Sequence, residues 1–245
     1  MKLTLKVWRQ SRPDAAGTFK KYEVDADPNM SWLELLDHLN AQRMREGKEP
    51  VAFDSDCREG ICGACGILIN GRPHGDTDNL PACHQRVGQR SEGEVVTIEP
   101  FRARQYPVIK DLMVDRSALD EILMAGGYSD TDTGTAPDAD EVGNTHQVAE
   151  LALDMAACIG CGACVVACPN GAANLFAGAK LAHLAALNVP SRQRKKRARE
   201  MVAVLDANFG PCSLYGECEA VCPAGIPLRA VAAVARERSY APRAK

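Results

Sequence analysis

The sequence lacks several features that would assign it to a common functional class. Its formal net charge is only −3 over 245 residues, so it has no basic excess of the kind that binds nucleic acid. It has no glycine fingerprint of a nucleotide-binding fold. Its opening residues, MKLTLKVW, alternate apolar and polar positions instead of forming a basic and then apolar leader. We therefore expect no signal peptide and a reducing, cytoplasmic compartment.

Charge is also absent from one long stretch, which has no acidic or basic residue between Met155 and Lys180. About 20 apolar residues are enough to cross a bilayer as a helix. This stretch, however, contains four cysteines, Pro169 and several glycines and asparagines. We predict a cysteine loop with flanking helices rather than a membrane span.

Cysteine is abundant, with 11 residues gathered in short groups. Disulfides, structural zinc and iron–sulfur clusters are the three chemistries that such groups serve. An odd number of cysteines, Cys-x-x-Cys spacing and a reducing compartment all argue against disulfides. Metal binding is therefore the favoured class, and zinc and iron–sulfur clusters are its two forms.

The first hundred residues are typical of a small β-rich domain. Ser31 and Glu34 form a capping-box signature at the start of a helix that ends near Gly47. Asn70-Gly71 is a strong hairpin signal. Alternating and β-branched residues predict strands over 3–7, 19–24, 67–69 and 95–98. We predict a β-grasp domain over residues 1–105.

The rest of the chain is predicted to be helical. Residues 106–146 are expected to be a linker with one helix over 117–125 and a polar, acidic loop over 129–145. Residues 147–245 form an alanine-rich helical domain, with predicted helices over 148–157, 172–187, 192–208 and 227–237. The predicted fold class is therefore α+β, a β-grasp ferredoxin-like domain followed by a helical, dicluster ferredoxin-like domain.

The first cysteine group has the spacing of a plant-type [2Fe–2S] ferredoxin. Three cysteines follow the pattern C-x4-C-x2-C, and a fourth follows after seventeen intervening residues. Glycines between them allow a tight, irregular loop with free N–H groups. Four thiolates also suit zinc, which stays the alternative. The four candidate ligands are Cys57, Cys62, Cys65 and Cys83.

The second group, CIGCGACVVACP over residues 158–169, is the bacterial ferredoxin run. In that run the fourth cysteine ligates the other cluster of a pair. A similar segment, CSLYGECEAVCP, covers residues 212–223. An exchange of the last cysteines then assigns one [4Fe–4S] cluster to Cys158, Cys161, Cys164 and Cys222.

The other cluster is left with only three cysteines, Cys168, Cys212 and Cys218. Aligning the two segments puts Tyr215 at the place of Cys161. A cubane that lacks one cysteine can lose the corresponding iron, so we predict [3Fe–4S] at this site. A [4Fe–4S] cluster completed by Tyr215 or by water is the alternative. This assignment uses all 11 cysteines.

The three motifs together resemble the iron–sulfur subunit of succinate dehydrogenase and fumarate reductase, over nearly the whole chain. The resemblance implies that electrons pass from FAD in a partner flavoprotein through [2Fe–2S], [4Fe–4S] and [3Fe–4S] clusters to a quinone. It implies integral membrane anchor subunits, with or without haem, and a peripheral position on the cytoplasmic face of a bacterial membrane. The dicarboxylate chemistry would belong to the flavoprotein, so no catalytic residue is expected in this chain.

Three positions bear on the type of quinone. Some ubiquinone-linked members of the family carry tryptophans where this chain has Ala172 and Ala173, and histidine where it has Ser213. We therefore expect menaquinone. The alternatives are a fumarate reductase running in the opposite direction, a stand-alone multi-cluster ferredoxin and a zinc-stabilised interaction protein.

A basic run, RQRKKRAR, covers residues 192–199. Such a run is usually a solvated helix face, and this is what we expect. Attraction to anionic lipid or to an acidic partner is the alternative.

Overall fold

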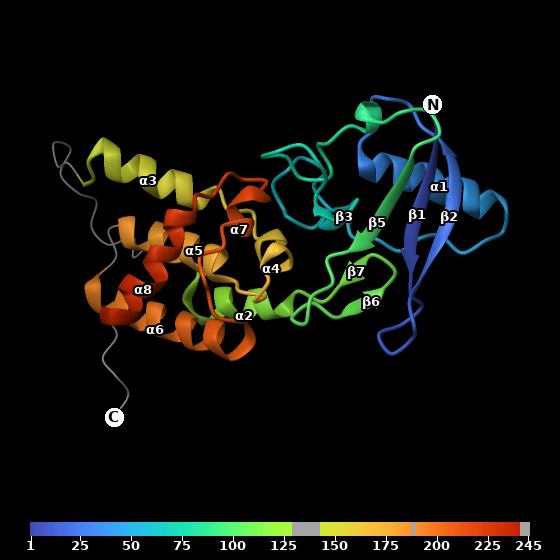
Figure 1. Cartoon of the computed structure of the whole chain (residues 1–245). Helices are drawn as coiled ribbons and strands as arrows, with labels where there is room; N and C mark the ends of the chain where they lie inside the picture. Colours follow the sequence, from blue (N-terminus) through green and yellow to red (C-terminus); the bar gives the residue numbers. More distant parts are fainter. Residues whose placement is uncertain (129–142, 188–189, 241–245) are drawn as a thin grey trace.

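The computed structural model describes residues 1–128, 143–187 and 190–240. Most of the predicted polar loop over 129–145 therefore lies outside the described residues. The chain forms two lobes, a sheet crossed by one helix and a group of helices (Figure 1). The predicted α+β class is confirmed.

The first lobe is built on a five-stranded mixed sheet in the order β2-β1-β5-β3-β4. β1 is antiparallel to β2 and parallel to β5. Leu3, Leu5 and Val7 are at most 1% exposed, so the alternation seen in the sequence is the buried face of β1. The strands are β1 (Lys2–Arg9), β2 (Thr18–Asp25), β3 (Ile67–Ile69), β4 (Arg72–Pro73) and β5 (Val95–Pro100).

Helix α1 (Trp32–Arg45) begins at the predicted capping box. The Ser31 hydroxyl accepts a hydrogen bond from the Glu34 amide at 3.3 Å, and the Ser31 amide donates to the Glu34 carboxylate at 2.6 Å. These bonds satisfy amides that the first turn of a helix leaves unpaired. The apolar face that follows, including Leu36 and Leu39, is buried in the core of the sheet lobe.

The Asn70-Gly71 hairpin joins β3 to β4 as predicted. Both residues have the positive φ values, 50° and 81°, that this tight turn requires. The Asn70 side chain also accepts a bond from the Thr97 amide at 2.8 Å and so fastens the turn to β5. The hairpin lies at the edge of the sheet next to the cysteine loops.

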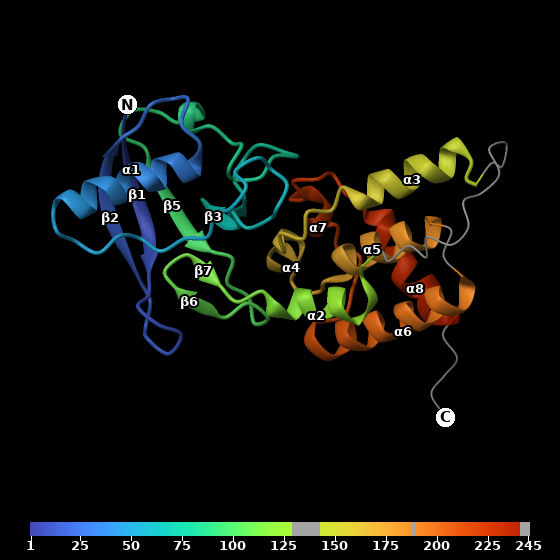
Figure 2. The same ribbon diagram turned by 180° about the vertical axis from the view of Figure 1, so that it is seen from behind.

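The segment that joins the lobes packs mainly into the helical lobe. It contains two short strands that were not predicted, β6 (Val108–Lys110) and β7 (Met113–Val114), and the predicted helix, α2 (Ser117–Gly126). Tyr106, Leu119 and Ile122 are buried in the same apolar cluster as Phe209. Seen from behind, α2 lies where the two lobes meet (Figure 2).

The helical lobe contains the four predicted helices with shifted ends. The first residues of the predicted 172–187 helix precede α5, and the predicted 227–237 helix begins as a 3₁₀ turn, η2. Two short helices inside the cysteine motifs, α4 and α7, were not predicted. The bounds are α3 (His146–Ala156), α4 (Ala163–Ala167), α5 (Asn174–Ala186), α6 (Ser191–Asn208), α7 (Glu217–Ala220), η2 (Leu228–Ala230) and α8 (Val231–Tyr240).

The basic run lies on α6, and the expectation of a solvated face is wrong at Arg197. Its side chain is only 6% exposed and lies over the Tyr128 ring at 4.5 Å. It also donates to the Tyr128 carbonyl oxygen. Arg194 lies 3.6 Å from the buried carboxylate of Glu237. Part of the run therefore holds α6 against its neighbours.

Among the described residues, no helix combines the length and the apolar character needed to cross a bilayer.

Candidate iron–sulfur cluster sites

The first cysteine loop aims backbone donors at sulfur. The amides of Glu59, Ile61 and Cys62 point at the Cys57 sulfur, at 3.3, 3.5 and 3.3 Å. The amide of Ala64 points at the Cys62 sulfur at 3.4 Å. Such donors favour the thiolate, which is the form that binds iron. The loop is thus shaped for anionic sulfur.

These bonds lower the pKa of Cys57 to about 7. Burial has the opposite effect on Cys65, whose pKa it raises to about 12. Cys65 and Cys83 are 4% and 6% exposed, so the loop holds one sheltered pair and one more open pair of thiols. Because metals bind the thiolate, loading this site must release protons.

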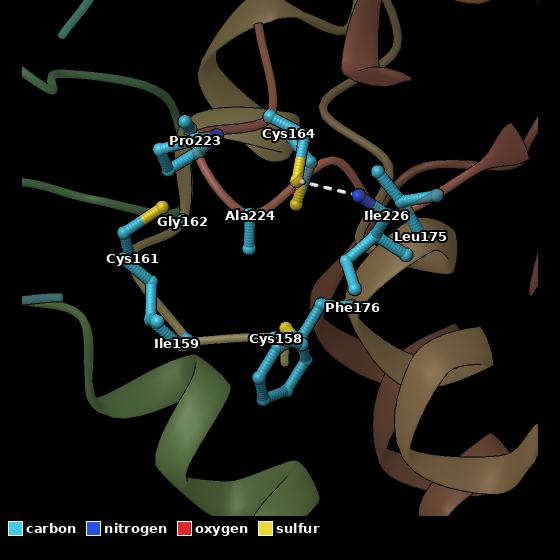
Figure 3. A pocket seen from close by; sticks show the side chains of 13 residues that line it. Cys158, Ile159, Cys161, Gly162, Cys164, Leu175, Phe176, Pro223, Ala224 and Ile226 are labelled. Atoms are coloured by element: carbon cyan, nitrogen blue, oxygen red, sulfur yellow. Dashed lines mark hydrogen bonds between the residues drawn. The ribbon is translucent and has the colours of Figure 1, made fainter. Parts of the chain in front are cut away.

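Four cysteines from both ferredoxin-like segments surround one cavity of about 20 Å³ (Figure 3). Leu175 and Phe176 of α5 and Ile226 supply apolar walls. The structure thus brings Cys222, from the second segment, to the three cysteines of the first. The cysteines that line this cavity are Cys158, Cys161, Cys164 and Cys222.

The surroundings of this cavity suit a buried cluster. Burial raises the pKa of Cys161 to about 12 and also raises that of Cys164 well above its ordinary value. The Ile226 amide donates to the Cys222 sulfur at 3.4 Å. Lys180 donates to the Cys158 carbonyl oxygen at 3.1 Å and so places a positive charge beside the cavity. Four thiols, an amide donor and apolar walls match the needs of a [4Fe–4S] cluster.

A second cavity, of about 10 Å³, is lined by the other three cysteines of this half. Tyr215 lines it as well, but its side chain is 61% exposed, and the neighbouring Leu214 is 64% exposed. Tyr215 therefore stands at the rim next to solvent. The three cysteines are Cys168, Cys212 and Cys218.

The cysteines of the helical lobe stand around the walls of cavities rather than around a point. Within the described residues, no three His, Cys, Asp or Glu side chains come together as the ligands of a single ion.

The two cysteine segments also share a backbone conformation. Gly162 and Gly216 occupy equivalent places, have φ values of +86° and +89°, and start α4 and α7. The repeat in the sequence is therefore a repeat in conformation.

The three cysteine sites lie in a row. Leu175 lines both cavities of the helical lobe and is 3% exposed. The first cysteine loop contacts the second at Gly63. A β-carbon at Gly63 would lie 2.4 Å from the Ile159 carbonyl oxygen, so the two backbones approach more closely there than a side chain would allow. Arg116 fastens this contact by donating to the carbonyl oxygens of Gly63 and Cys161, at 2.6 and 3.0 Å.

Two residues near the sites were not anticipated from the sequence. Arg116 precedes α2 and has no spacing relation to the cysteines. Tyr106 is completely buried, and burial raises the pKa of its phenol, an effect that the nearby thiols of Cys164 and Cys161 increase. No local pattern marks either residue, because tertiary packing alone brings them to the cysteines. His183, in contrast, is half-buried and bonds the Ala152 carbonyl oxygen at 2.9 Å.

Comparisons with known proteins agree with this geometry. Residues 4–121 match the model of a 2Fe-2S iron-sulfur cluster binding domain, and residues 157–226 match that of a 4Fe-4S dicluster domain. The chain is 31% identical to the fumarate reductase iron-sulfur subunit of Mycobacterium tuberculosis, over 87% of this chain and 82% of that protein. It is 26% identical to the succinate dehydrogenase iron-sulfur subunit of Bacillus subtilis, over 94% and 90% of the two chains.

The fold is that of a chain in the apo Sdh1 complex of Mycobacterium smegmatis, with a TM-score of 0.71, 23% identity and 99% of each chain covered. The cysteine geometry, the two domain models and the relatives agree. This chain therefore belongs to the family of succinate dehydrogenase and fumarate reductase iron–sulfur subunits, as an electron-transfer subunit with a [2Fe–2S] domain followed by a dicluster domain.

Proposed function

We propose that this chain conducts electrons between FAD in a flavoprotein subunit and a quinone at a membrane. The observation that carries the proposal is the row of three cysteine sites, joined by Gly63 at one junction and Leu175 at the other. When bound, three iron–sulfur clusters would supply one-electron redox chemistry along this row. The dicarboxylate reaction itself would take place on the flavoprotein.

The proposed ligands follow the three groupings. The four cysteines of the first loop hold [2Fe–2S], with amides supporting Cys57. The four around the larger cavity hold [4Fe–4S], with Cys222 supplied by the second segment. The three cysteines around the second cavity hold [3Fe–4S]. The respective sets are Cys57, Cys62, Cys65 and Cys83; Cys158, Cys161, Cys164 and Cys222; and Cys168, Cys212 and Cys218.

For the three-cysteine site, we favour [3Fe–4S] over a tyrosine-ligated [4Fe–4S]. Tyr215 is mostly exposed, which supports a role at the rim rather than as an iron ligand. Its neighbour Leu214 has a left-handed backbone, with φ of 58°, and an exposed side chain. Two exposed apolar residues beside a cavity suit contact with a membrane anchor subunit that contributes to a quinone site.

The flavoprotein would contact the opposite end of the row. Ile61, between the ligands of the first loop, is 66% exposed, as suits a residue covered by a partner. The complex would lie on the cytoplasmic face of a bacterial membrane. Ala172, Ala173 and Ser213 support menaquinone as the quinone. Relatives named for succinate oxidation and for fumarate reduction both match, so fumarate reductase is the second candidate.

The test is to purify the chain anaerobically with the subunits that accompany it. We expect bound flavin, about nine iron atoms per chain from the three cluster types, and a [3Fe–4S] EPR signal near g = 2 in the oxidised state. A chain that holds zinc and no iron would contradict the proposal. A stable isolated monomer with all clusters and no flavoprotein would instead support a stand-alone ferredoxin.

A further inference from the structure

The hydroxyl of Tyr106 is a buried polar group that lacks a hydrogen-bond partner among the described residues. Its side chain has no exposed area. The ring packs edge-on against Phe209, with centroids 6.5 Å apart, in the apolar core of the helical lobe. An unpaired hydroxyl in such a place costs about 1–3 kcal/mol. Phenylalanine would fill the same space without this cost. We therefore expect the hydroxyl to form a hydrogen bond with a group that is bound in the functional protein.

The hydroxyl end of the Tyr106 ring lies against the first ferredoxin-like segment. A β-carbon built on Gly162 would lie 3.0 Å from the Tyr106 oxygen, nearer than to any other atom of the ring. Gly162 follows Cys161 and lies two residues before Cys164, and all three line the larger cavity. The absence of a side chain at Gly162 lets the phenol reach this wall.

Two cationic side chains nearby already donate hydrogen bonds to backbone oxygens. Arg116 donates to the carbonyl of Cys161, and Lys180 donates to the carbonyl of Cys158. They contribute charge to the surroundings of the cavity. Tyr106 differs, because its hydroxyl lies against Gly162 and no protein atom among the described residues accepts its hydrogen bond.

We propose that the Tyr106 hydroxyl donates a hydrogen bond to a sulfur of the iron–sulfur cluster, on the side held by Cys161 and Cys164. The inference rests on the proposed function, since it requires the [4Fe–4S] cluster in this cavity. A hydrogen bond to an anionic sulfur is charge-assisted and strengthens as negative charge increases. The bond therefore stabilises the reduced cluster and raises its reduction potential. Tyr106 is a tuning residue for one step of the electron path.

The direct test is Tyr106→Phe in the assembled complex, which removes the O–H and keeps the ring. At a fixed applied potential near the midpoint, we expect the ratio of reduced to oxidised [4Fe–4S] to fall by about three- to tenfold, and tenfold corresponds to 59 mV for one electron. The other two cluster potentials should not change. EPR-monitored redox titration measures all three. Tyr22→Phe is the matched control, because its hydroxyl bonds Arg9 in the sheet lobe, and it should shift no potential.

A second measurement detects the hydrogen bond itself. The reduced wild-type complex, examined by pulsed ENDOR in H2O and D2O, should show an exchangeable proton coupled to the [4Fe–4S] cluster, and Tyr106→Phe should lose it. If Tyr106→Phe lowers only the melting temperature and leaves the potential and the proton coupling unchanged, the residue is structural and the proposal is overturned. A complex without any [4Fe–4S] signal would instead overturn the cluster assignment itself, so the two failures are distinguishable.

Discussion

Tyr215 occupies, in the second cysteine segment, the place that Cys161 occupies in the first, and Gly216 repeats the left-handed turn of Gly162. The backbone is therefore similar where the side chains differ. We expect Tyr215→Cys to supply a fourth thiolate and to convert [3Fe–4S] to [4Fe–4S] at this site. The oxidised EPR signal near g = 2 should disappear, and electron delivery to quinone should fall about tenfold or more as the potential drops.

Tyr215→Phe is the control for that change. It removes the hydroxyl without adding a ligand, so the [3Fe–4S] signal should remain. If Tyr215→Cys kept the signal and full activity, the cysteine would not reach the iron. If Tyr215→Phe abolished the signal, the tyrosine would be a ligand after all.

Exchange of the last cysteines between the two segments gives a second prediction at the level of single residues. Cys222→Ser should perturb the reduced [4Fe–4S] signal and leave the [3Fe–4S] signal in place, although Cys222 belongs to the second segment. Cys168→Ser should do the reverse. EPR of the oxidised form of each variant measures the [3Fe–4S] signal, and EPR of the reduced form measures the [4Fe–4S] signal. The opposite pattern would mean that each segment holds its own cluster.

At the level of elements, regular periodicity and capping residues predicted strands and helices well, as for α1 behind Ser31 and Glu34. The short elements escaped prediction for a physical reason. α4 and α7 have five and four residues, so they carry too little periodicity to be seen. β6 and β7 are held by pairing with each other and by burial of Tyr106 and Val114, which depend on the folded core.

The capping box of α1 gives a pH-dependent prediction. The bonds from the Ser31 amide and hydroxyl group lower the pKa of Glu34 below its ordinary value. A carboxylate with a lowered pKa stabilises the fold above its ordinary pKa, and this contribution is lost as the pH falls through the folded value. Glu34→Gln should therefore lower the melting temperature at neutral pH and flatten its decline below about pH 4.5. Glu23→Gln, on the exposed face of β2, is the control and should do neither.

Arg116 links the loop of one lobe to the loop of the other. Arg116→Gln removes a charged donor from the carbonyls of Gly63 and Cys161, and we expect unfolding stability to fall by about 1.5–3 kcal/mol. Thermal denaturation of the loaded complex measures this. Arg104→Gln changes an exposed arginine of the same segment for which the described residues show no ion pair, and it should have little effect. Equal losses in both variants would contradict a bridging role for Arg116.

At the scale of the whole molecule, the cysteine groupings could be proposed from the sequence because ligand spacing is a local property of the chain. The order of the sites in space was implied only by the family resemblance, because ligand spacing alone does not determine it. It depends on Gly63 meeting Ile159 and on Leu175 lying between two cavities, and both contacts join residues far apart in sequence. Domain placement likewise followed from packing. Residues 106–122, predicted as part of a linker, contribute to the core of the helical lobe.

Removal of iron should affect the helical lobe in a defined region. α7 has no buried residue, and the cysteines around it contribute to a small apolar cluster with Met155 and Ile226. We expect the cluster-free chain to melt at a lower temperature and to be cleaved first within residues 211–225. Limited proteolysis with mass spectrometry, before and after chelation, locates the cuts. Cleavage confined to the sheet lobe would contradict this expectation.

The proposed exchange of Cys168 and Cys222 between the two clusters would have a mechanical consequence. Each cluster would act as a covalent cross-link between distant points of the chain, one joining Cys164 to Cys222 and the other Cys168 to Cys212, with one loop inside the other. If loop-closure entropy applies as it does for disulfides, the outer link alone would restrict the unfolded chain by about 4 kcal/mol. The same metal centres that carry electrons would thus keep the helical lobe tied together when its helices separate.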